Sequence, residues 1–397
     1  MSELDVVVFG ATGFVGALVA QHLAQTATAD VRIGLAGRSK EKLEKVRDGL
    51  DRDWPLLVVD AQDPAQLTDS ARVVCTTVGP YARYGRPLVE ACARTGTHYL
   101  DLTGEVLFVR PVIDDLHDVA AASGAKVVPS CGYDSIPSDL AVLLLAEQAE
   151  ADVAGALGET TLVASVKGGI SGGTVDSLRA QVEMVKARPE TAALIEDPYS
   201  LSPDRASEPQ LQERPDRAGV ERGPDGRWTG PFVMAQYNTR VVRRTNALLG
   251  YAYGRELRYQ ERMSFGSGLL APVLAGGAAM VLPLAEPLMG FGPSRAVLDR
   301  VLPKPGSGPS EKARNSGWFR MDVDTTTSTG AHYRAVVAGK GDPGYAATAV
   351  MMGQSALCLA FDEIPDRAGV LTPATAMGDA LVERLRAQGI ELSVTRA

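Results

Sequence analysis

The first residues that could do chemistry are the glycines of the run Gly10-Ala-Thr-Gly-Phe-Val-Gly16, which follows a short apolar segment. Binding a diphosphate requires backbone N–H groups and the N-terminus of a helix close at hand. In such a loop one glycine permits a tight turn, one lets the backbone approach the diphosphate, and one lets helix and strand pack closely. We therefore predict a dinucleotide-binding loop made by Gly10, Thr12, Gly13, Phe14, Val15 and Gly16.

The choice of nucleotide is made at the end of the next predicted strand. An Asp or Glu there would hydrogen-bond the ribose 2′-hydroxyl of NAD and repel a 2′-phosphate. The sequence has Ala-Gly-Arg-Ser-Lys at residues 36–40 instead, with no acid. A guanidinium pairs with a phosphate in a forked geometry and stacks on a purine, although Arg38 could also simply face water. We predict NADPH as the cofactor, held at its adenosine end by Gly37, Arg38, Ser39 and Asp60.

A second loop, Thr-Thr-Val-Gly-Pro-Tyr at residues 76–81, ends the predicted fourth strand. This edge of a Rossmann sheet presents residues to the nicotinamide ribose, so we expect Thr77, Gly79 and Pro80 to contact the cofactor. Tyr81 is either a catalytic residue or an ordinary loop aromatic. The short-chain dehydrogenase mechanism is disfavoured, because none of the eleven tyrosines is followed by a lysine four residues on.

Strands and helices must alternate to bring these loops to one edge, and the N-terminal sequence has that alternation. Short apolar β-branched runs are typical of buried parallel strands, and the segments between them have helical spacing. The predicted class is α/β, with an N-terminal Rossmann doubly wound parallel sheet in residues 1–133. The predicted strands are Leu4–Phe9, Val31–Ala36, Pro55–Val59, Ala71–Val78, His98–Leu102 and Lys126–Pro129, and the helices are Phe14–Ala24, Lys40–Leu50, Pro87–Thr95 and Val112–Ser123.

The pattern changes in residues 134–397, for which we predict a second, mixed α+β domain that carries the substrate and forms oligomer contacts. Residues 189–231 are rich in Pro, Asp, Glu and Arg with little periodicity, so we expect a flexible surface excursion there. The predicted elements are an antiparallel hairpin of Phe319–Ser328 and Ala331–Lys340, a strand Thr160–Lys167, and the helices Thr174–Arg188, Tyr345–Leu359 and Pro373–Gln388.

Residues 264–291 are unusually apolar. From Ser264 to Leu284 there is no charged residue, which is long enough to raise the question of a transmembrane helix. Pro272, Pro283 and several glycines interrupt the run, and lipid-exposed backbone must satisfy its own hydrogen bonds. The alternatives are a buried helix, or a surface for a lipid chain, a membrane face or a second copy of the chain in a homo-oligomer.

Composition limits the partners and the compartment. The net charge is −8 and the isoelectric point is near 5.2. Nucleic-acid phosphates demand a basic surface, so no nucleic-acid partner is expected. The four cysteines are scattered without CxxC or metal-ligand spacing, so we predict no metal site and a reducing compartment. Because the acidic N-terminus runs directly into a strand, we expect no signal peptide and a cytoplasmic location, with peripheral membrane contact as an option.

Several motifs that occur in order carry a resemblance to a known family. They are GATGFVG, AGRS, TTVGPY, HYLDLTGE, CGYDSIPSD, GGISGGT and GVLTP. With them the chain resembles the saccharopine dehydrogenase-like oxidoreductases, particularly the trans-acting enoyl reductase branch. The resemblance implies an NADPH-dependent reductase that acts on long, carrier-bound lipid substrates, with a polyketide synthase lacking its own reductase domain as partner.

Reduction of an activated C=C bond needs a hydride at the β-carbon, a proton donor for the α-carbon and a donor to the thioester oxygen. Tyr133 follows the sixth predicted strand at the cofactor edge, and Lys167 precedes a glycine-rich turn. With Tyr81, these two are the candidate catalytic residues. Structural alternatives exist, because Asp134, Ser135 and Ser138 match a helix-capping pattern worth about 1 kcal/mol. Cys131 fits a small buried residue better than a nucleophile.

Two other functions fit parts of the sequence. A saccharopine-type amino-acid dehydrogenase would need basic residues to hold a dicarboxylate, and only Lys167 and Arg179 suggest themselves. A lipid- or membrane-associated scaffold would retain NADP(H) without turnover. An intact path for hydride transfer to an acceptor separates both reductases from the scaffold.

Overall fold

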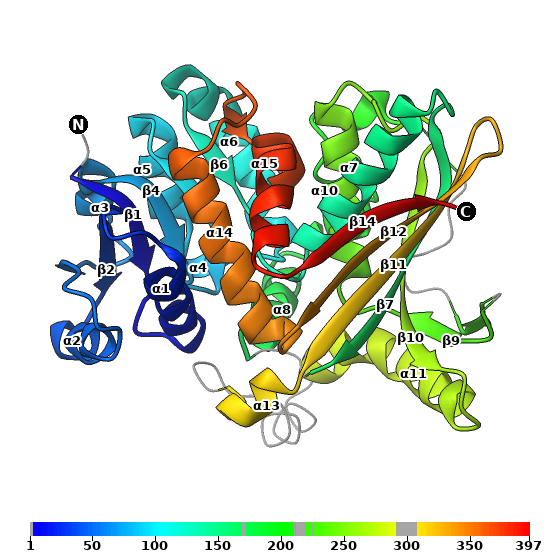
Figure 1. Cartoon of the computed structure of the whole chain (residues 1–397), viewed down its shortest axis with the longest axis horizontal. Coiled ribbons are helices and arrows are strands. Elements are labelled where there is room, and N and C mark those ends of the chain that lie inside the picture. The colour runs from blue at the N-terminus through cyan, green and yellow to red at the C-terminus, as the bar shows by residue number, and fades with distance from the viewer. Residues whose placement is uncertain (1–2, 169–171, 210, 212–218, 224, 291–307) are drawn as a thin grey trace.

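The computed structural model describes residues 3–168, 172–209, 211, 219–223, 225–290 and 308–397. In this part of the chain, two seven-stranded sheets lie side by side. Helices α14 (Thr348–Phe361) and α15 (Pro373–Ala387) pack between them (Figure 1). The loops predicted to bind the cofactor belong to the first sheet.

The first sheet is parallel throughout, as the sequence predicts for a Rossmann domain. Its strand order is β13-β6-β5-β4-β1-β2-β3, so the chain winds in opposite directions from β1. Ligands bind at the carboxyl edge beside such a reversal. The strands are β1 (Leu4–Phe9), β2 (Ile33–Gly37), β3 (Leu56–Val58), β4 (Ala71–Thr76), β5 (His98–Leu100), β6 (Lys126–Val128) and β13 (Gly369–Val370).

Helices cover the first sheet, and four of them end at a glycine, namely Gly49, Gly85, Gly96 and Gly124. The helix predicted from Val112 begins six residues earlier, at Val106, with Pro111 inside it. The helices are α1 (Phe14–Thr26), α2 (Lys40–Asp48), α3 (Ala65–Ser70), α4 (Tyr81–Tyr84), α5 (Arg86–Thr95) and α6 (Val106–Ser123).

The chain returns to the first sheet near its C-terminus. Strand β13 pairs with β6 in parallel, and α14 packs against α1, β1 and β4. The predicted division at residue 133 therefore does not separate everything that builds the first sheet, because residues of the second half complete it.

The second sheet is mixed, in the order β14-β12-β11-β7-β10-β9-β8. Only the β7–β10 pair is parallel among its described pairings, and the predicted hairpin is confirmed as β11 paired antiparallel with β12. The strands are β7 (Leu157–Lys167), β8 (Glu221–Arg222), β9 (Trp228–Pro231), β10 (Arg258–Gly266), β11 (Trp318–Thr327), β12 (His332–Lys340) and β14 (Glu391–Arg396). Its helices are α7 (Ile136–Ala151), α8 (Gly172–Ala187), α9 (Thr191–Glu196), α10 (Ala235–Leu248), α11 (Ala271–Gly290) and α13 (Glu311–Asn315).

Part of the expected flexible excursion, residues 195–202, is held inside the protein. Arg244 on α10 donates to the carbonyl of Leu201 at 2.7 Å, and Arg110 on α6 donates to that of Ser202 at 2.8 Å. Arg240 and Arg243 reach the carbonyls of Ile195 to Pro198 in the same way. Charged donors that take several carbonyls at once stabilise irregular backbone in the interior. Residues 210, 212–218 and 224 of the expected excursion lie outside the described part.

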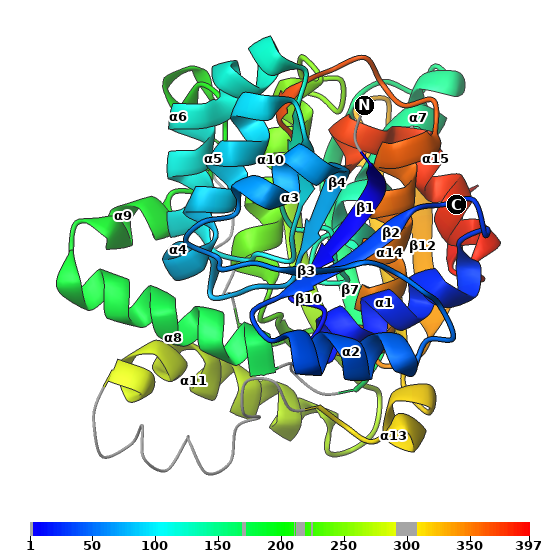
Figure 2. The ribbon, with the colours of Figure 1, turned by 90° about the vertical axis from the view of Figure 1, so that its left-hand side faces the viewer.

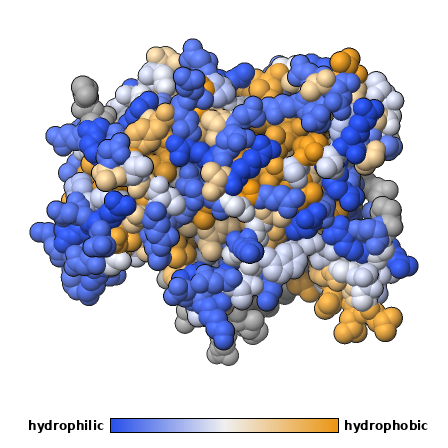
Figure 3. Space-filling model, viewed as in Figure 1, coloured by the Kyte–Doolittle hydropathy of each residue, from blue (hydrophilic) through white to orange (hydrophobic). Residues whose placement is uncertain are grey.

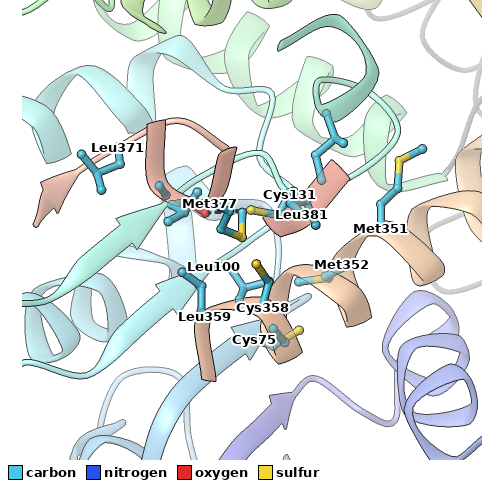
Figure 4. Packing of buried hydrophobic residues seen from close by; sticks show 14 of the residues in the cluster. Cys75, Leu100, Cys131, Met351, Met352, Cys358, Leu359, Leu371, Met377 and Leu381 are labelled. Carbon is cyan, nitrogen blue, oxygen red and sulfur yellow. Dashed lines mark hydrogen bonds between the residues drawn. The ribbon is translucent and has the colours of Figure 1, made fainter. Parts of the chain in front are cut away.

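The core between the first sheet and α14 is rich in sulfur. Figure 4 shows Cys75 of β4, Cys358 of α14 and Cys131, which follows β6, packed among Leu100 and Met352. All four cysteines are buried and free of disulfide bonds. Burial raises the pKa of these thiols, so Cys131 is a packing residue rather than a nucleophile.

The apolar segment presents its aliphatic side chains outward. Leu269 is 97% exposed, Leu270 71% and Val273 69%, whereas Ala271 and Ala275 face inward. Helix α11 contacts β9 and α8 and lies beneath α8 in Figure 2. The hydrophobic surface at the lower right of Figure 3 lies where Figure 1 places α11. The apolar face of a surface helix ordinarily points to the core, so these exposed aliphatic side chains depart from the usual arrangement. The side chains of residues 282–290, and residue 291, lie outside the description.

Among the described residues, one helical stretch is long and apolar enough to cross a membrane, Pro343–Phe361. Most of it is buried inside the protein, between the two sheets. Burial of this kind is typical of a core helix.

Replacing Leu269, Leu270 and Val273 together by Ser should leave the protein folded. These side chains are exposed, so their loss should change the free energy of unfolding by less than about 0.5 kcal/mol each. Thermal unfolding and NADPH titration of the triple variant measure this. Ala275→Leu is the matched control, and it should destabilise by about 1–3 kcal/mol because it overpacks a buried site. A triple variant that fails to fold would show that the segment belongs to the core.

Candidate cofactor and active site

The loop between β1 and α1 depends on two close approaches of the backbone. Gly10 has φ +88°, and a Cβ on it would lie 2.7 Å from Oγ1 of Thr77. A Cβ on Gly16 would lie 2.2 Å from the carbonyl oxygen of Gly10. Both positions therefore exclude side chains, and they press the start of α1 against β1 and the loop after β4.

The N-terminus of α1 is open toward the expected diphosphate. Gly13 is the N-cap residue, and no side chain caps the helix. Among the described residues, the only atom within 4 Å of a Cβ on Gly13 would be the Gly10 oxygen, at 3.2 Å. The N–H groups of Phe14 and Val15 lie in the first turn of α1. The Phe14 ring packs edge-on against Tyr345, with the two ring centroids 5.0 Å apart. Unpaired N–H groups at a helix start bind anions.

The adenosine end of the site is formed after β2. Ser39 caps α2 by accepting a hydrogen bond from the Lys42 N–H at 3.4 Å, so its hydroxyl has a structural partner. Arg38 is exposed and makes no ion pair with any described residue, which leaves its guanidinium available to a 2′-phosphate. A Cβ on Gly37 would lie 3.6 Å from Thr12 Oγ1, so these two residues adjoin. Asp60 is exposed and accepts the Gln62 N–H at 2.9 Å within a turn.

The loop after β4 is held in place by hydrogen bonds of Tyr81 and Glu105. The Tyr81 hydroxyl donates to the Thr76 carbonyl and accepts the Leu102 N–H, both at 3.2 Å. The buried Glu105 carboxylate accepts the N–H groups of Tyr81 at 3.1 Å and of Ala82 at 2.8 Å. Tyr81 therefore has no proton to spare for a substrate and acts as a positioning residue for Thr77, Gly79 and Pro80.

Asp101 fixes the loop after β6 in the same manner. Its buried carboxylate accepts the N–H groups of Thr103 and Ser130, each at 2.9 Å, and the Tyr99 hydroxyl at 2.7 Å. Ser130 has φ +67°, a strained conformation for a residue other than glycine. Its hydroxyl lies 2.6 Å from that of Tyr237 on α10. Burial raises the pKa of Asp101 to about 6, and these hydrogen bonds oppose that rise.

The loop between β6 and α7 carries Tyr133 and Asp134. The Tyr133 ring lies edge-on to Phe319 of β11 at 5.0 Å, and its buried hydroxyl has no hydrogen-bond partner among the described residues. Burial raises its pKa well above 10. Ser135 bonds to Asn238 at 3.0 Å rather than to the start of α7, so the predicted cap is not formed. Tyr133 thus lies where the two sheets face each other.

Lys167 ends β7 and is exposed, next to the glycine-rich turn. Residues 169–171 of that turn lie outside the described part. Arg179, the other cation considered for a dicarboxylate, lies 3.7 Å from Asp176 on the same helix. Among the described residues, no group of His, Cys, Asp and Glu is placed to hold a metal ion.

The segment Asp342–Thr348 joins the loops, and sequence reasoning missed it. Its π-helical turn, Pro343–Ala347, places Tyr345 against Phe14 and lets the Tyr345 hydroxyl accept the Gly172 N–H at 3.0 Å. Thr348 accepts the Tyr133 N–H at 3.3 Å. The Asp-Pro-Gly sequence just before the predicted helix Tyr345–Leu359 was the available signal, since it marks a turn; the α-helix itself begins at Thr348. Single π turns are frequent at functional sites.

The fold and the site together define an NADP-dependent oxidoreductase with a Rossmann domain and a second, mixed sheet. A family model described as the saccharopine dehydrogenase NADP-binding domain matches residues 6–128. The chain belongs to the family of trans-acting enoyl reductases, because it is 46–50% identical to members of that family along 99% of its length. The predicted resemblance and the NADP cofactor are both confirmed.

Three mycobacterial relatives match along nearly the whole chain. A trans-acting enoyl reductase from Mycobacterium ulcerans (strain Agy99) is 48% identical, and one from Mycobacterium bovis (strain BCG / Pasteur 1173P2) is 46% identical. A third relative, from Mycobacterium tuberculosis (strain ATCC 25618 / H37Rv), is provisionally named a trans-acting enoyl reductase and is 50% identical. Each alignment covers 99% of this chain and 98% of the relative.

Two solved structures confirm the fold. Apo saccharopine dehydrogenase (L-Glu forming) from Saccharomyces cerevisiae superposes with a TM-score of 0.62 at 12% identity, covering 99% of this chain and 100% of that one. Homospermidine synthase from Legionella pneumophila, in complex with NAD, gives 0.53 at 10% identity, covering 100% and 92%. At such identities the likeness concerns the fold alone.

Gly13→Val should abolish NADPH binding while the protein stays folded. The new side chain would fill the space that the diphosphate needs, and its one close contact is the Gly10 oxygen. Calorimetric titration with NADPH measures the loss. Gly16→Val is the contrasting variant and should fail to fold, because its Cβ has no room. Normal NADPH binding by the Gly13 variant would mean that the loop has been misread.

Arg38→Ala should weaken NADPH binding several-fold and leave NADH binding nearly unchanged, because only NADPH carries the 2′-phosphate that the guanidinium would pair. Lys45→Ala is a charge-matched control on α2, since Lys45 pairs with Glu41 away from the strand end. Dissociation constants for both cofactors decide the matter. Equal affinities of the unaltered protein for NADPH and NADH would contradict the assignment of Arg38.

Proposed function

We propose that this protein is an NADPH-dependent enoyl reductase that reduces the C=C bond of a lipid- or polyketide-type thioester presented in trans. The observation that carries the proposal is the 46–50% identity, along 99% of the chain, to relatives whose names describe trans-acting enoyl reduction. The NADP-binding domain supplies the reductant that such a reaction needs.

The chain's own residues have three tasks in this reaction. When bound, NADPH supplies the hydride. The start of α1 and Arg38 hold its phosphates. Glu105 and Asp101 keep the loops after β4 and β6 rigid, so that the nicotinamide and the C=C bond meet at a fixed distance. A group at the same edge must then give a proton to the α-carbon.

Acting in trans requires a partner that carries the acyl chain, for which we propose a polyketide synthase without its own reductase domain. The exposed aliphatic residues around α11 are where we expect a lipid chain, a membrane face or a second subunit to lie. A cytoplasmic location with peripheral membrane contact remains a prediction that agrees with this surface.

Two alternatives are less well supported. For an amino-acid dehydrogenase, Arg179 pairs with Asp176 and Lys167 is exposed, so neither offers a buried clamp for a dicarboxylate. A scaffold without turnover is less well supported because the relatives at 46–50% identity carry names that describe enoyl reduction.

The test is NADPH oxidation by the purified protein with a 2-enoyl thioester of N-acetylcysteamine and with the same acyl group on a carrier protein. We expect oxidation and a product heavier by two hydrogen atoms, faster with the carrier. The saturated thioester is the control and should give no oxidation. Turnover with saccharopine but not with the enoyl thioesters would support the amino-acid dehydrogenase. NADPH binding without oxidation by any acceptor would support the scaffold.

A further inference from the structure

Asp134 is an exception in a long buried stretch of chain. Every residue from 125 to 143 is buried except Asp134, which keeps part of its surface exposed. It lies between β6 and α7, at the carboxyl edge of the first sheet and on the nicotinamide side of the strand reversal. Its partial exposure at this edge distinguishes it from its neighbours in the sequence, which are all buried.

The Asp134 carboxylate has no structural work among the described residues. It makes no hydrogen bond or ion pair with them, and no side chain caps α7. The three other acids of this edge are all engaged. Asp101 and Glu105 accept backbone N–H groups of the loops, and Asp139 accepts the Ala374 N–H at 2.8 Å and the Thr245 hydroxyl. Desolvated carboxyls are ordinarily paired, so a lone one is typical of a functional group.

The surroundings keep this carboxyl able to carry a proton. Burial raises the pKa of Asp134 to about 6, and no charge of the described residues contributes to that shift. The negative charge of Asp134 adds to the rise in the pKa of the Tyr133 hydroxyl, as do the charges of Glu261 on β10 and of Asp342. A general acid works best when its pKa is near the operating pH.

We propose that Asp134 is the catalytic acid of the reduction, giving its proton to the α-carbon of the enoyl thioester. This rests on the proposed enoyl reduction. As hydride from NADPH forms the new C–H bond at the β-carbon, the C=C electron pair moves toward the thioester carbonyl. That pair then takes the Asp134 proton and forms the C–H bond at the α-carbon. The carboxylate left behind regains a proton from water, so one hydride and one proton are consumed in each turnover.

The other candidate acids fit this task less well. The Tyr81 hydroxyl is bonded to the backbone on both sides. The Tyr133 hydroxyl is fully enclosed, and its pKa lies well above 10. Lys167 is exposed at the end of β7. Of these groups, Asp134 alone combines partial exposure, position at the cofactor edge and freedom from other bonds in the described structure.

The test compares Asp134→Asn, Asp134→Glu and Tyr133→Phe with the unaltered protein, using a 2-enoyl N-acetylcysteamine thioester and NADPH. Asp134→Asn should lower kcat by about 100-fold or more, the usual contribution of a general acid, with an unchanged melting temperature and NADPH affinity. Because the acid must be protonated, kcat of the unaltered protein should fall as pH rises through its pKa. Asp134→Asn should lose this limb, and Asp134→Glu should recover both the limb and part of the rate. Asp118→Asn, an exposed aspartate on α6, is the matched control and should behave like the unaltered protein.

Each other outcome overturns the proposal. An Asp134→Asn variant that keeps its rate and its pH limb means that another group gives the proton. A limb that disappears in Tyr133→Phe instead assigns the acid to Tyr133. An Asp134→Asn variant that melts early or loses NADPH binding, with no recovery in Asp134→Glu, means a structural role. If the unaltered protein binds NADPH but reduces no enoyl thioester, the proposed function itself fails, and the role of Asp134 fails with it.

Discussion

Loops that leave the carboxyl edge of a buried parallel sheet bring backbone N–H groups into the interior, and each of these needs an acceptor. In this protein, carboxylates supply the acceptors. Glu105 takes the N–H groups of Tyr81 and Ala82, and Asp101 takes those of Thr103 and Ser130. Moving either loop would leave a desolvated charge unpaired, which costs far more than a lost neutral hydrogen bond. The loops that face the nicotinamide are therefore rigid before any ligand arrives.

The same device fastens the second half of the chain to the first sheet. Glu105 also accepts the Ser177 hydroxyl of α8 at 2.7 Å, and Asp139 accepts the Ala374 N–H at the start of α15. Burial raises the pKa of Asp139 to about 7, although the hydrogen bonds from Thr245 and Ala374 act in the opposite direction. These hydrogen bonds join helices from distant parts of the sequence, and buried hydrophobic residues of both sheets belong to one core cluster. The candidate site thus lies where hydrogen bonds join the first sheet to helices of the second half of the chain.

Local pattern was sufficient to predict the Rossmann half and the β11–β12 hairpin, because their strands are short apolar or alternating runs between turn residues. It did not predict α10, in which nearly every residue from Ala235 to Asn246 is buried, Arg240, Arg243 and Arg244 included. Pattern rules place Arg at the surface. Here the guanidinium groups are accommodated by carbonyl oxygens of residues 195–202, which the composition alone had suggested would be a loose excursion. Neither segment can be inferred without the other.

The candidate site has the same limit at the level of single residues. The sequence does not distinguish four acids, because each stands beside an apolar run. They are Asp101, Glu105, Asp134 and Asp139. Their difference lies in hydrogen bonds to groups that are distant in the sequence, such as the bond from the Ala374 N–H to the Asp139 carboxylate, and no local pattern encodes these bonds. Asp101, Glu105 and Asp139 accept hydrogen bonds that hold the loops and the start of α15 in place. Asp134 is positioned by these elements and makes no such bond with the described residues. A proton donor needs a fixed position more than it needs partners of its own. Rigidity supplied by neighbouring acids is therefore what allows Asp134 to remain unbonded and still be held at the cofactor edge.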